Sequence, residues 1–395
     1  MKIPQGYKQT EVGVIPEDWD VSTLGRCVSI YDGTHQTPHY VTVGIPFYSV
    51  ENVSSNDFKH TKYISLDEHL YLTKRWKIER GDILMTRIGS VGVCKHINWN
   101  VNASFYVSLA LLKPFRHISA EYIVVASNAL YFKEEIISNS LPFAIPQKIN
   151  LRNIASIRIL LPPIEEQKRI AEALGDVDKL IAALDKKIAK KKLIKQAAMQ
   201  QLLTGKKRLQ GFSEEWETRK LGEISQIKTG KRNGDEQTEH GKYPFFVRSS
   251  VIARIDSYSF DGEAILVPGE GGIGNIFHYI NGKFDYHQRV YKISDFADFV
   301  CGKYIYYYMQ RYFGEYAMSL TVKATVDSLR LPTFEEFKVD LPINIKEQQA
   351  IANVLSDMDE EILDLERKRD KYQLLKNGMM QKLLTGQIRL NIQYI

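Results

Sequence analysis

The chain has 395 residues, of which 44% are hydrophobic and 25% charged, and its formal net charge is +6. This length suits two or three domains, and the composition is that of an ordinary soluble globular protein. The apolar runs are too short for a bilayer-spanning helix, and the N-terminus lacks the apolar core of a signal peptide. The three cysteines are widely spaced and form no CxxC pair, which argues against disulfides and a thiolate metal site and favours a reducing cytoplasm.

Residues 1–160 are expected to form a first globular domain of mixed α and β structure. Runs of apolar and β-branched residues between turn signals predict strands at 83–87, 108–112 and 157–161, and an amphipathic pattern predicts a helix over 120–137. Residues 161–207 follow as a helical region. The alternating four- and three-residue spacing of a coiled-coil seam is kept there by Ile170, Leu174, Val177, Ile181, Leu184 and Ile188.

A second globular domain is expected over residues 208–340 and a second helical region over 341–395. Strands are predicted at 264–267 and 289–293, and a helix over 302–318. The second helical region has a matching seam made of Ile351, Leu355, Met358, Ile362 and Leu365. Prolines precede both helices and a Thr-Gly pair ends each, so each is expected to span about 60 Å.

The two halves of the chain repeat each other. Glu166-Gln167 recurs as Glu347-Gln348, and QLLTG at 201–205 recurs as KLLTG at 382–386, each displaced by 181 residues. More loosely, Trp19 recurs as Trp216, and Gly81-Asp82-Ile83-Leu84 recurs as Gly262-Glu263-Ala264-Ile265. A repeat this long indicates domain duplication. The predicted fold class is therefore α+β, with two similar globular domains joined by two long helices about a pseudo-twofold axis.

The charges of the two helices predict that they pair in an antiparallel sense. Each helix is acidic early, as at Asp176 and Asp178 or at 357–366, and basic later, as at 186–195 or at 367–376. A parallel pair would set like charges against each other, whereas an antiparallel pair sets acid against base. We expect an intramolecular antiparallel coiled coil that holds one domain at each end. The alternative is that each helix packs only on its own domain.

Loops between the predicted strands carry the side chains that read base edges and hold phosphates. Solvated turns favour several of the same residue types, so single positions are weak evidence. The candidates for contact with DNA are Thr34, His35, Gln36, Thr86, Arg87, Ser90, Lys228, Lys231, Arg232, Asn233, Arg248, Ser249, His287, Gln288 and Arg289. The loop TRIGSVG at 86–92 is basic, whereas PGEGGIG at 268–274 carries Glu270, so the two domains are expected to bind different sequences.

Motifs for catalysis by this chain alone are weak. The stretch 269–274 formally matches GxGxxG, but the residues after it look extended, whereas a dinucleotide site needs a helix there. The histidines form no metal-ligand spacing, and no P-loop, HExxH or GxSxG is present. We therefore predict no catalytic residue, metal site or cofactor in this chain.

The twin motifs carry a family resemblance. LPPxEEQxxIA at 161–171 and LPxxxxEQxxIA at 341–352, each followed by LLTG, resemble the specificity subunit of type I restriction-modification systems. The N-terminal stretch GYKQTEVGVIP at 6–16 and the spacing from Trp19 to Leu24-Gly25 are similar to that family as well. The resemblance covers essentially the whole chain.

This resemblance implies that two target recognition domains each read one half of a split, asymmetric DNA target. The helical regions would set the spacing of the half-sites and dock methyltransferase subunits. A full complex would hold one copy of this chain, two modification subunits and two ATP-driven restriction subunits, with S-adenosylmethionine, ATP and Mg²⁺ bound by the partners. Because recognition loops vary within the family, individual contact residues do not carry over. Arg87→Ala or Arg289→Ala is expected to affect one half-site only.

Two other classes of function stay open on sequence grounds. One is a scaffold that joins proteins through its coiled coil and has no role on DNA. The other is a solitary methyltransferase or nuclease, against which the missing cofactor and metal motifs argue.

Overall fold

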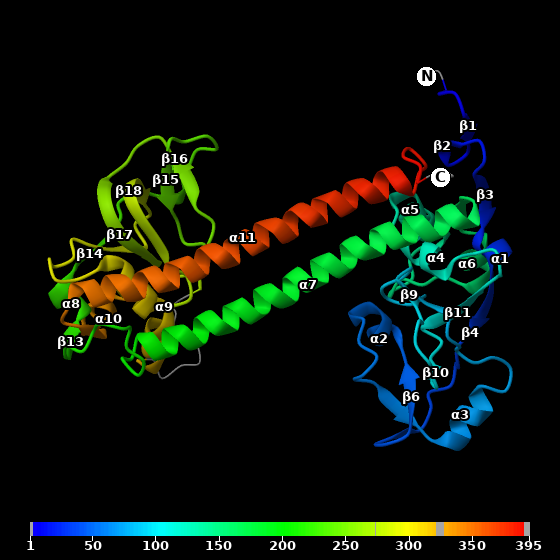
Figure 1. Cartoon of the computed structure of the whole chain (residues 1–395), viewed down its shortest axis with the longest axis horizontal. Helices are drawn as coiled ribbons and strands as arrows, with labels where there is room; N and C mark the ends of the chain where they lie inside the picture. Colours follow the sequence, from blue (N-terminus) through cyan, green and yellow to red (C-terminus); the bar gives the residue numbers. More distant parts are fainter. Residues whose placement is uncertain (1–2, 273, 321–327, 391–395) are drawn as a thin grey trace. The chain divides into compact units, whose positions relative to one another are not determined.

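A computed structural model describes residues 3–272, 274–320 and 328–390 of the chain. The chain divides into two compact units, coloured along the sequence in Figure 1. Unit 1 comprises residues 1–183 and 368–395, and unit 2 comprises residues 184–367. Each unit therefore contains one globular domain together with parts of two long helices. Among the described residues, none of the helices has an apolar stretch of the kind that crossing a membrane requires.

The globular part of unit 1 is built on two four-stranded sheets, in the orders β4-β11-β8-β9 and β10-β6-β7-β5, and two strand pairs, β1-β2 and β12-β3. The strands are β1 (Tyr7–Thr10), β2 (Gly13–Pro16), β3 (Asp20–Thr23), β4 (Val28–Asp32), β5 (Tyr40–Val41), β6 (Ile45–Tyr48), β7 (Lys62–Ile64), β8 (Ile83–Thr86), β9 (Cys94–His96), β10 (Ser104–Phe105), β11 (Leu109–Pro114) and β12 (Arg158–Leu161). The short helices are α1 (Leu24–Cys27), α2 (Val50–Ser55), α3 (Leu66–Leu72), α4 (Ala120–Ala126), α5 (Leu130–Asn139) and α6 (Leu151–Ser156). The main core lies between the first of these sheets and α4–α6.

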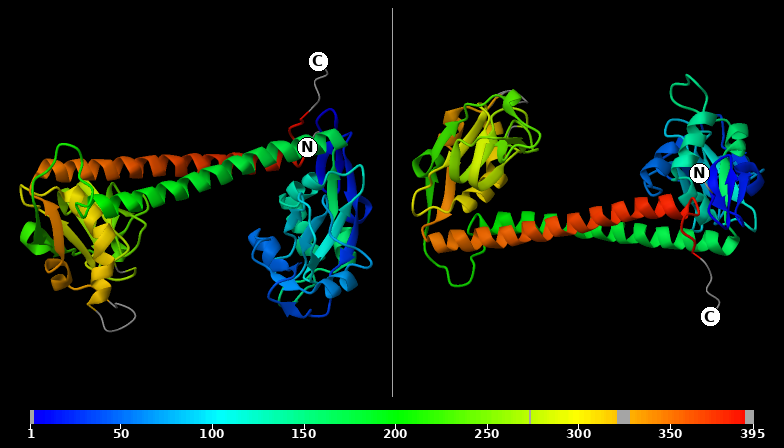
Figure 2. Two further views of the ribbon diagram at one scale, coloured as in Figure 1. Left: turned by 60° about the horizontal axis from the view of Figure 1, so that its bottom comes forward. Right: turned by 90° about the horizontal axis from the view of Figure 1, so that it is seen from above.

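Unit 2 repeats this plan around one six-stranded sheet, β14-β19-β17-β18-β15-β16, and one strand pair, β13-β20. Its strands are β13 (Trp216–Lys220), β14 (Gln226–Thr229), β15 (Tyr243–Phe246), β16 (Ala253–Ile255), β17 (Phe260–Pro268), β18 (His278–Tyr286), β19 (Val290–Ser294) and β20 (Lys338–Pro342). Its helices are α8 (Leu221–Ile224), the 3₁₀ turn η1 (Gly234–Glu236), α9 (Gly302–Ser319) and α10 (Leu331–Glu335). Figure 2 shows α9, in yellow, beside the ends of the long helices in this unit, where its tyrosines share a core with them.

The α+β class is confirmed, and so are the predicted strands and the helix over 302–318. The single helix predicted over 120–137 is wrong, because it is broken into α4 and α5 at residues 127–129. The side chains of Ser127 and Asn128 both donate to the carbonyl of Val124, which offers the backbone an alternative to continuing the helix.

The sequence match of residues 81–84 with residues 262–265 is shifted by one residue from the equivalence that the two sheets show. Ile83 faces Leu112 across the sheet of unit 1, and Ile265, not Ala264, faces Ile293 at the equivalent place in unit 2. Side chains alternate between the faces of a sheet, so a displacement of one residue moves a side chain to the opposite face. Ile83 and Ile265 accordingly both lie in the main cores of their units.

The long helices α7 (Ile164–Leu202) and α11 (Ile345–Leu383) pair in an antiparallel sense within each unit. In unit 1, Lys376 Nζ lies 2.5 Å from Asp178 Oδ1. In unit 2, Lys191 Nζ lies 2.7 Å from Glu361 Oε2, and Lys195 Nζ lies 2.5 Å from Asp359 Oδ1. In each pair an early residue of one helix meets a late residue of the other, so the antiparallel pairing predicted from the charge pattern is confirmed.

Most residues of the predicted seam are buried. Its buried members are Ile170, Leu174, Ile181, Leu184, Ile188, Ile351, Leu355 and Ile362. Val177, Met358 and Leu365 are only partly buried. After residue 188 the buried positions of α7 move to Met199 and Leu202, and Ile194 is exposed.

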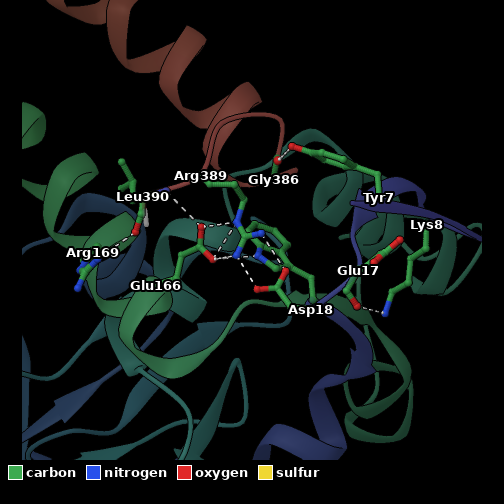
Figure 3. Close-up of polar contacts among 10 residues, drawn as sticks. Tyr7, Lys8, Glu17, Asp18, Glu166, Arg169, Gly386, Arg389 and Leu390 are labelled. Carbon is green, nitrogen blue, oxygen red and sulfur yellow. Dashed lines mark hydrogen bonds and ion pairs between the residues drawn. The ribbon is translucent and has the colours of Figure 1, made fainter. Parts of the chain in front are cut away.

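In each unit, the repeated arginine after LLTG binds the buried glutamate of the repeated Glu-Gln pair, a contact that we call a clamp. In unit 1, the guanidinium of Arg389 binds both carboxylate oxygens of Glu166 and also Asp18 (Figure 3). Trp19 Nε1 donates to Glu166 at 3.0 Å. Figure 3 also shows the Tyr7 hydroxyl donating to the carbonyl of Gly386, at 3.0 Å. These contacts fix the end of α11 to the first strands of unit 1.

The clamp of unit 2 has the same parts at the displaced positions. Arg208 Nε and Nη2 donate to the two oxygens of the fully buried Glu347 at 2.5 and 2.6 Å, and the guanidinium lies 5.7 Å from the ring of Trp216. The adjacent glutamine is buried in both units. Gln348 accepts from Cys301 N and donates to Pro342 O, as Gln167 accepts from Ser119 N and donates to Pro162 O.

Candidate nucleic-acid interface

The candidate loops of each unit meet on the same backbone framework. In unit 1, the loop after β4 forms a parallel bridge from Thr34 to Tyr106, in the turn between β10 and β11. In unit 2, the loop after β14 forms the equivalent bridge from Arg232 to His287, in the turn between β18 and β19. The residues that follow, Val107 and Gln288, donate their amides back across each bridge at 3.0 and 2.9 Å. The framework is therefore duplicated, whereas the side chains on it differ.

A glycine lets the two backbones approach in each framework. A Cβ atom added to Gly33 would lie 2.5 Å from the carbonyl of Tyr106, and one added to Gly230 would lie 2.1 Å from the carbonyl oxygen of Tyr286. No side chain other than hydrogen fits at such a distance from backbone atoms. These two glycines therefore permit the contact between the loops.

In unit 1, the strongest basic candidate is buried. The side chain of Arg87 is 5% exposed, and its Nη1 lies 2.5 Å from Asp32 Oδ1. Thr86 is fully buried, and its hydroxyl donates to the carbonyl of Ser90 and accepts from Val93 N. This burial does not favour the predicted direct contact of Thr86 and Arg87 with DNA, which stays a prediction. The Thr86 hydroxyl bonds the backbone at both ends of the turn at 90–93, whereas Arg87 pairs with the partly buried Asp32 at the end of β4.

The remaining candidates of unit 1 are accessible. His35, Gln36 and Ser90 are exposed, and Thr34 is half-buried. His35 Nε2 lies 2.7 Å from Asp32 Oδ2, so Asp32 connects the loop after β4 to the loop after β8. Thr34 uses its hydroxyl within its own loop, where it bonds the backbone of Gln36. His35, Gln36 and Ser90 are the predicted side chains of this unit that are free to face a ligand.

In unit 2, the side chains of two candidates, Arg232 and His287, are likewise bonded to other groups of the protein. Arg232 binds three acceptors, namely Asp285 Oδ2 at 3.1 Å, Glu236 Oε2 at 2.8 Å and Ser257 Oγ at 2.9 Å. His287 is buried, and its Nδ1 accepts the amide of Arg289 at 3.0 Å. Burial and two nearby arginines lower the pKa of His287, so the ring is neutral at pH 7. This burial favours a supporting role for His287 over the predicted direct contact with DNA, which stays a prediction.

The other candidates of unit 2 lie at the surface of the joined loops. Gln288 Nε2 donates to Asn233 Oδ1 at 2.7 Å, which places two side-chain amides side by side. Arg248 and Arg289 are about half exposed and share one carboxylate, that of Glu270. Lys228 and Lys231 are exposed on β14 and after it, and Ser249 is partly buried beside Arg248. Sequence reasoning missed the acids Asp32 and Asp285, whose only signal was their place at a strand end beside candidate residues.

A second surface, on the long helices, is repeated at a displacement of 181 residues. In unit 2, Leu193 is 67% and Ile194 44% exposed, and Lys187 and Lys190 lie on the preceding turns of α7. In unit 1, Leu374 and Leu375 are 72% and 49% exposed on α11. They are likewise preceded by the exposed residues Lys368 and Lys371. We call these surfaces the Leu193 patch and the Leu374 patch.

Comparison with known proteins gives one consistent result. A family model described as the type I restriction modification DNA specificity domain matches residues 16–193 and 213–375. A protein of Methanocaldococcus jannaschii, provisionally named the MjaX type I restriction enzyme specificity subunit, is 25% identical and aligns over 98% of this chain and 97% of its own. The MjaVIII specificity subunit of the same organism is 23% identical over 98% and 96% of the two chains.

The fold has a solved counterpart. The crystal structure of the type I restriction-modification system S subunit from M. genitalium covers 97% of this chain and 98% of its own, with a TM-score of 0.69 at 14% sequence identity. At that identity the likeness concerns the fold alone.

Proposed function

The chain belongs to the type I restriction-modification DNA specificity family, and we propose that each of its units reads one half of a bipartite, asymmetric DNA target. The observation that carries the proposal is the duplicated loop framework. The same bridge, turn and close-approach glycine recur in both units and present different side chains. Two readers on one framework suit two half-sites, and different side chains suit an asymmetric target.

The long helices would set the distance between the half-sites. Each has 39 residues and is therefore about 60 Å long. For dimeric DNA readers, the separation of half-sites follows from the separation of the reading elements. Insertion or deletion of helical turns in both helices at once would accordingly change the number of unspecified base pairs between the half-sites.

We assign the Leu193 patch and the Leu374 patch to the docking of two modification subunits. An exposed apolar pair flanked by two lysines would fit an apolar pocket with an acidic rim on the partner. Since the pattern recurs at the same displacement as the rest of the helix, two copies of one partner are favoured over two different partners.

Leu193→Asp is expected to reduce the modification subunits bound per chain from two to one, and Leu193→Asp with Leu374→Asp is expected to leave none bound. A charge placed in an apolar contact weakens that site by about 2 kcal/mol or more. Native mass spectrometry of the purified complex measures the stoichiometry. Leu363→Asp is the matched control, because Leu363 is exposed on α11 but its counterpart is Ala182. Equal loss with this control would contradict the assignment.

We propose the remaining parts of the complex from the family to which the chain belongs. The chain itself would carry out no chemistry, and a DNA adenine methyltransferase and an ATP-dependent restriction endonuclease would act through two subunits of each kind. These partners would bind S-adenosylmethionine, ATP and Mg²⁺, and the complex would work in the cytoplasm. Among the described residues, no cluster of three potential ligands that could hold a metal ion is found in this chain.

The test is the mapping of methylated adenines by long-read sequencing in a methylation-free host. The host expresses the chain with its modification subunits, and a parallel culture omits the chain. One bipartite asymmetric motif that disappears when the chain is omitted supports the proposal. Absence of any motif despite a soluble co-purifying complex would instead favour the alternative of a coiled-coil scaffold without a role on DNA.

A further inference from the structure

Three loops of unit 2 bring two arginines and one acid together at the surface. Arg248 follows β15, Glu270 follows β17, and Arg289 lies in the turn between β18 and β19. Glu270 Oε2 accepts from Arg248 Nη1 at 3.3 Å, and Glu270 Oε1 accepts from Arg289 Nη1. The side chains of the two arginines are 51% and 55% exposed, and that of Glu270 is 26% exposed. We call this cluster the arginine pair.

The backbone beneath the arginine pair is fixed by buried contacts. The amide of Arg289 donates to the neutral ring of His287, and its carbonyl accepts from Gly269 N at 2.8 Å. The Gly269 carbonyl in turn accepts from Leu329 N at 2.8 Å, which anchors the loop that carries Glu270. The loop ends are thus held in place, and the carboxylate restricts the guanidinium ends as well.

The carboxylate of Glu270, which lies between the two arginines, favours their contact with a base over contact with a phosphate. A carboxylate beside two exposed arginines repels phosphate and halves the net positive charge of the cluster, which would weaken a phosphate site. The same carboxylate fixes one Nη of each guanidinium. Among the described residues, no further side-chain partner binds either guanidinium, so the edge formed by Nε and Nη2 stays available on each. Such an edge matches the O6 and N7 acceptors of guanine in the major groove.

We infer that Arg248 and Arg289 contact guanine bases in the half-site read by unit 2, and that Glu270 is the positioning residue for both. The inference rests on the proposed function of this unit and names the base class that it recognises. The equivalent of Arg289 in unit 1 is Ser108, which is buried and whose carbonyl accepts from Arg87 N as the Arg289 carbonyl accepts from Gly269 N. Guanine recognition of this kind is therefore confined to one half-site.

The first experiment measures binding of the full complex to its mapped target and to variants of that target. Replacing the contacted guanine by 7-deazaguanine removes the N7 acceptor, and the wild-type complex is expected to lose about 10- to 100-fold in affinity. Arg289→Ala is expected to lose a similar factor on the natural target and to become insensitive to 7-deazaguanine at that position. Arg289→Lys, which keeps the charge at an exposed position, is expected to stay folded and to show the same insensitivity.

Glu270→Gln separates positioning from a simple charge effect. If Glu270 positions the arginines, this variant binds all DNA somewhat more tightly, with a steeper salt dependence, but discriminates less against 7-deazaguanine. If the ion pairs are incidental, affinity rises equally for all sequences and discrimination is unchanged. That result would overturn the role of Glu270.

The outcomes also separate this inference from the proposed function. If the wild-type complex methylates no bipartite motif, the proposed function itself is contradicted. A motif that contains no guanine in the half-site of unit 2 would overturn the inference alone. The inference would also be overturned if Arg289→Ala lowered the affinity equally for the natural and the 7-deazaguanine target, because equal loss indicates a phosphate contact.

Discussion

Arg208→Ala is expected to lower the free energy of unfolding by about 3–5 kcal/mol, since it leaves a buried carboxylate without its partner. Glu347 is fully buried, and Arg208 satisfies both of its oxygens through Nε and Nη2. An unpaired charge at such a place costs far more than the pair contributes. The end of α7 should detach from β13 as well, because the same guanidinium bonds the carbonyl of Glu214 and lies over Trp216.

Chemical denaturation monitored by the fluorescence of Trp216 and the other tryptophans measures this effect. Arg208→Met combined with Glu347→Gln removes both charges and should recover most of the lost stability. Arg219→Ala serves as the matched control, because Arg219 pairs with Glu217 at the surface of the same unit and its loss should cost less than about 1 kcal/mol. A small effect of Arg208→Ala, equal to that of the control, would show that Glu347 finds other partners.

The clamps show which part of the fold the sequence predicts and which part it does not. The helices can be predicted because the seam is a periodic pattern within one segment, and their antiparallel pairing can be predicted by comparing the acidic and basic blocks of the two segments. The repeated Glu-Gln and the arginine after LLTG were visible as a motif, but their contact was not. Arg208 meets Glu347 across 139 positions and Arg389 meets Glu166 across 223, and a single sequence gives no signal for such pairing.

The candidate site was predicted in part for a related reason. Residue type and loop position identified Arg248, Arg289, Gln288 and Asn233, which lie together on joined loops. The same criteria also selected Arg87 and His287, which are buried. Whether a basic side chain faces solvent depends on an acid brought close by folding, as Asp32 is for Arg87. Loop chemistry therefore selects residues that lie on neighbouring loops, without separating the exposed side chains from the buried ones.

Gly230→Ala is expected to abolish recognition of the half-site read by unit 2 while the other half-site is retained. The added Cβ would lie 2.1 Å from the carbonyl oxygen of Tyr286 and 2.6 Å from that of His287. These are backbone atoms in the turn that carries Arg289, so the clash can be relieved only by separating the loop after β14 from that turn. The separation would break the bond from Gln288 N to Arg232 O and move Asn233 away from Gln288. We expect a loss of about 100-fold or more in affinity for the target, equivalent to about 3 kcal/mol.

Binding to targets with one half-site scrambled measures this effect. The wild-type complex should lose affinity when either half-site is scrambled, whereas the Gly230→Ala complex should respond only to scrambling of the half-site read by unit 1. Gly234→Ala is the matched control, because it lies four residues further along the same loop and an added Cβ meets nothing within 4 Å. Sensitivity to both half-sites in Gly230→Ala would mean that the loops need not touch in order to read DNA. Loss of both half-sites together would mean that the two units do not read independently, and the duplicated framework would then no longer account for a bipartite target.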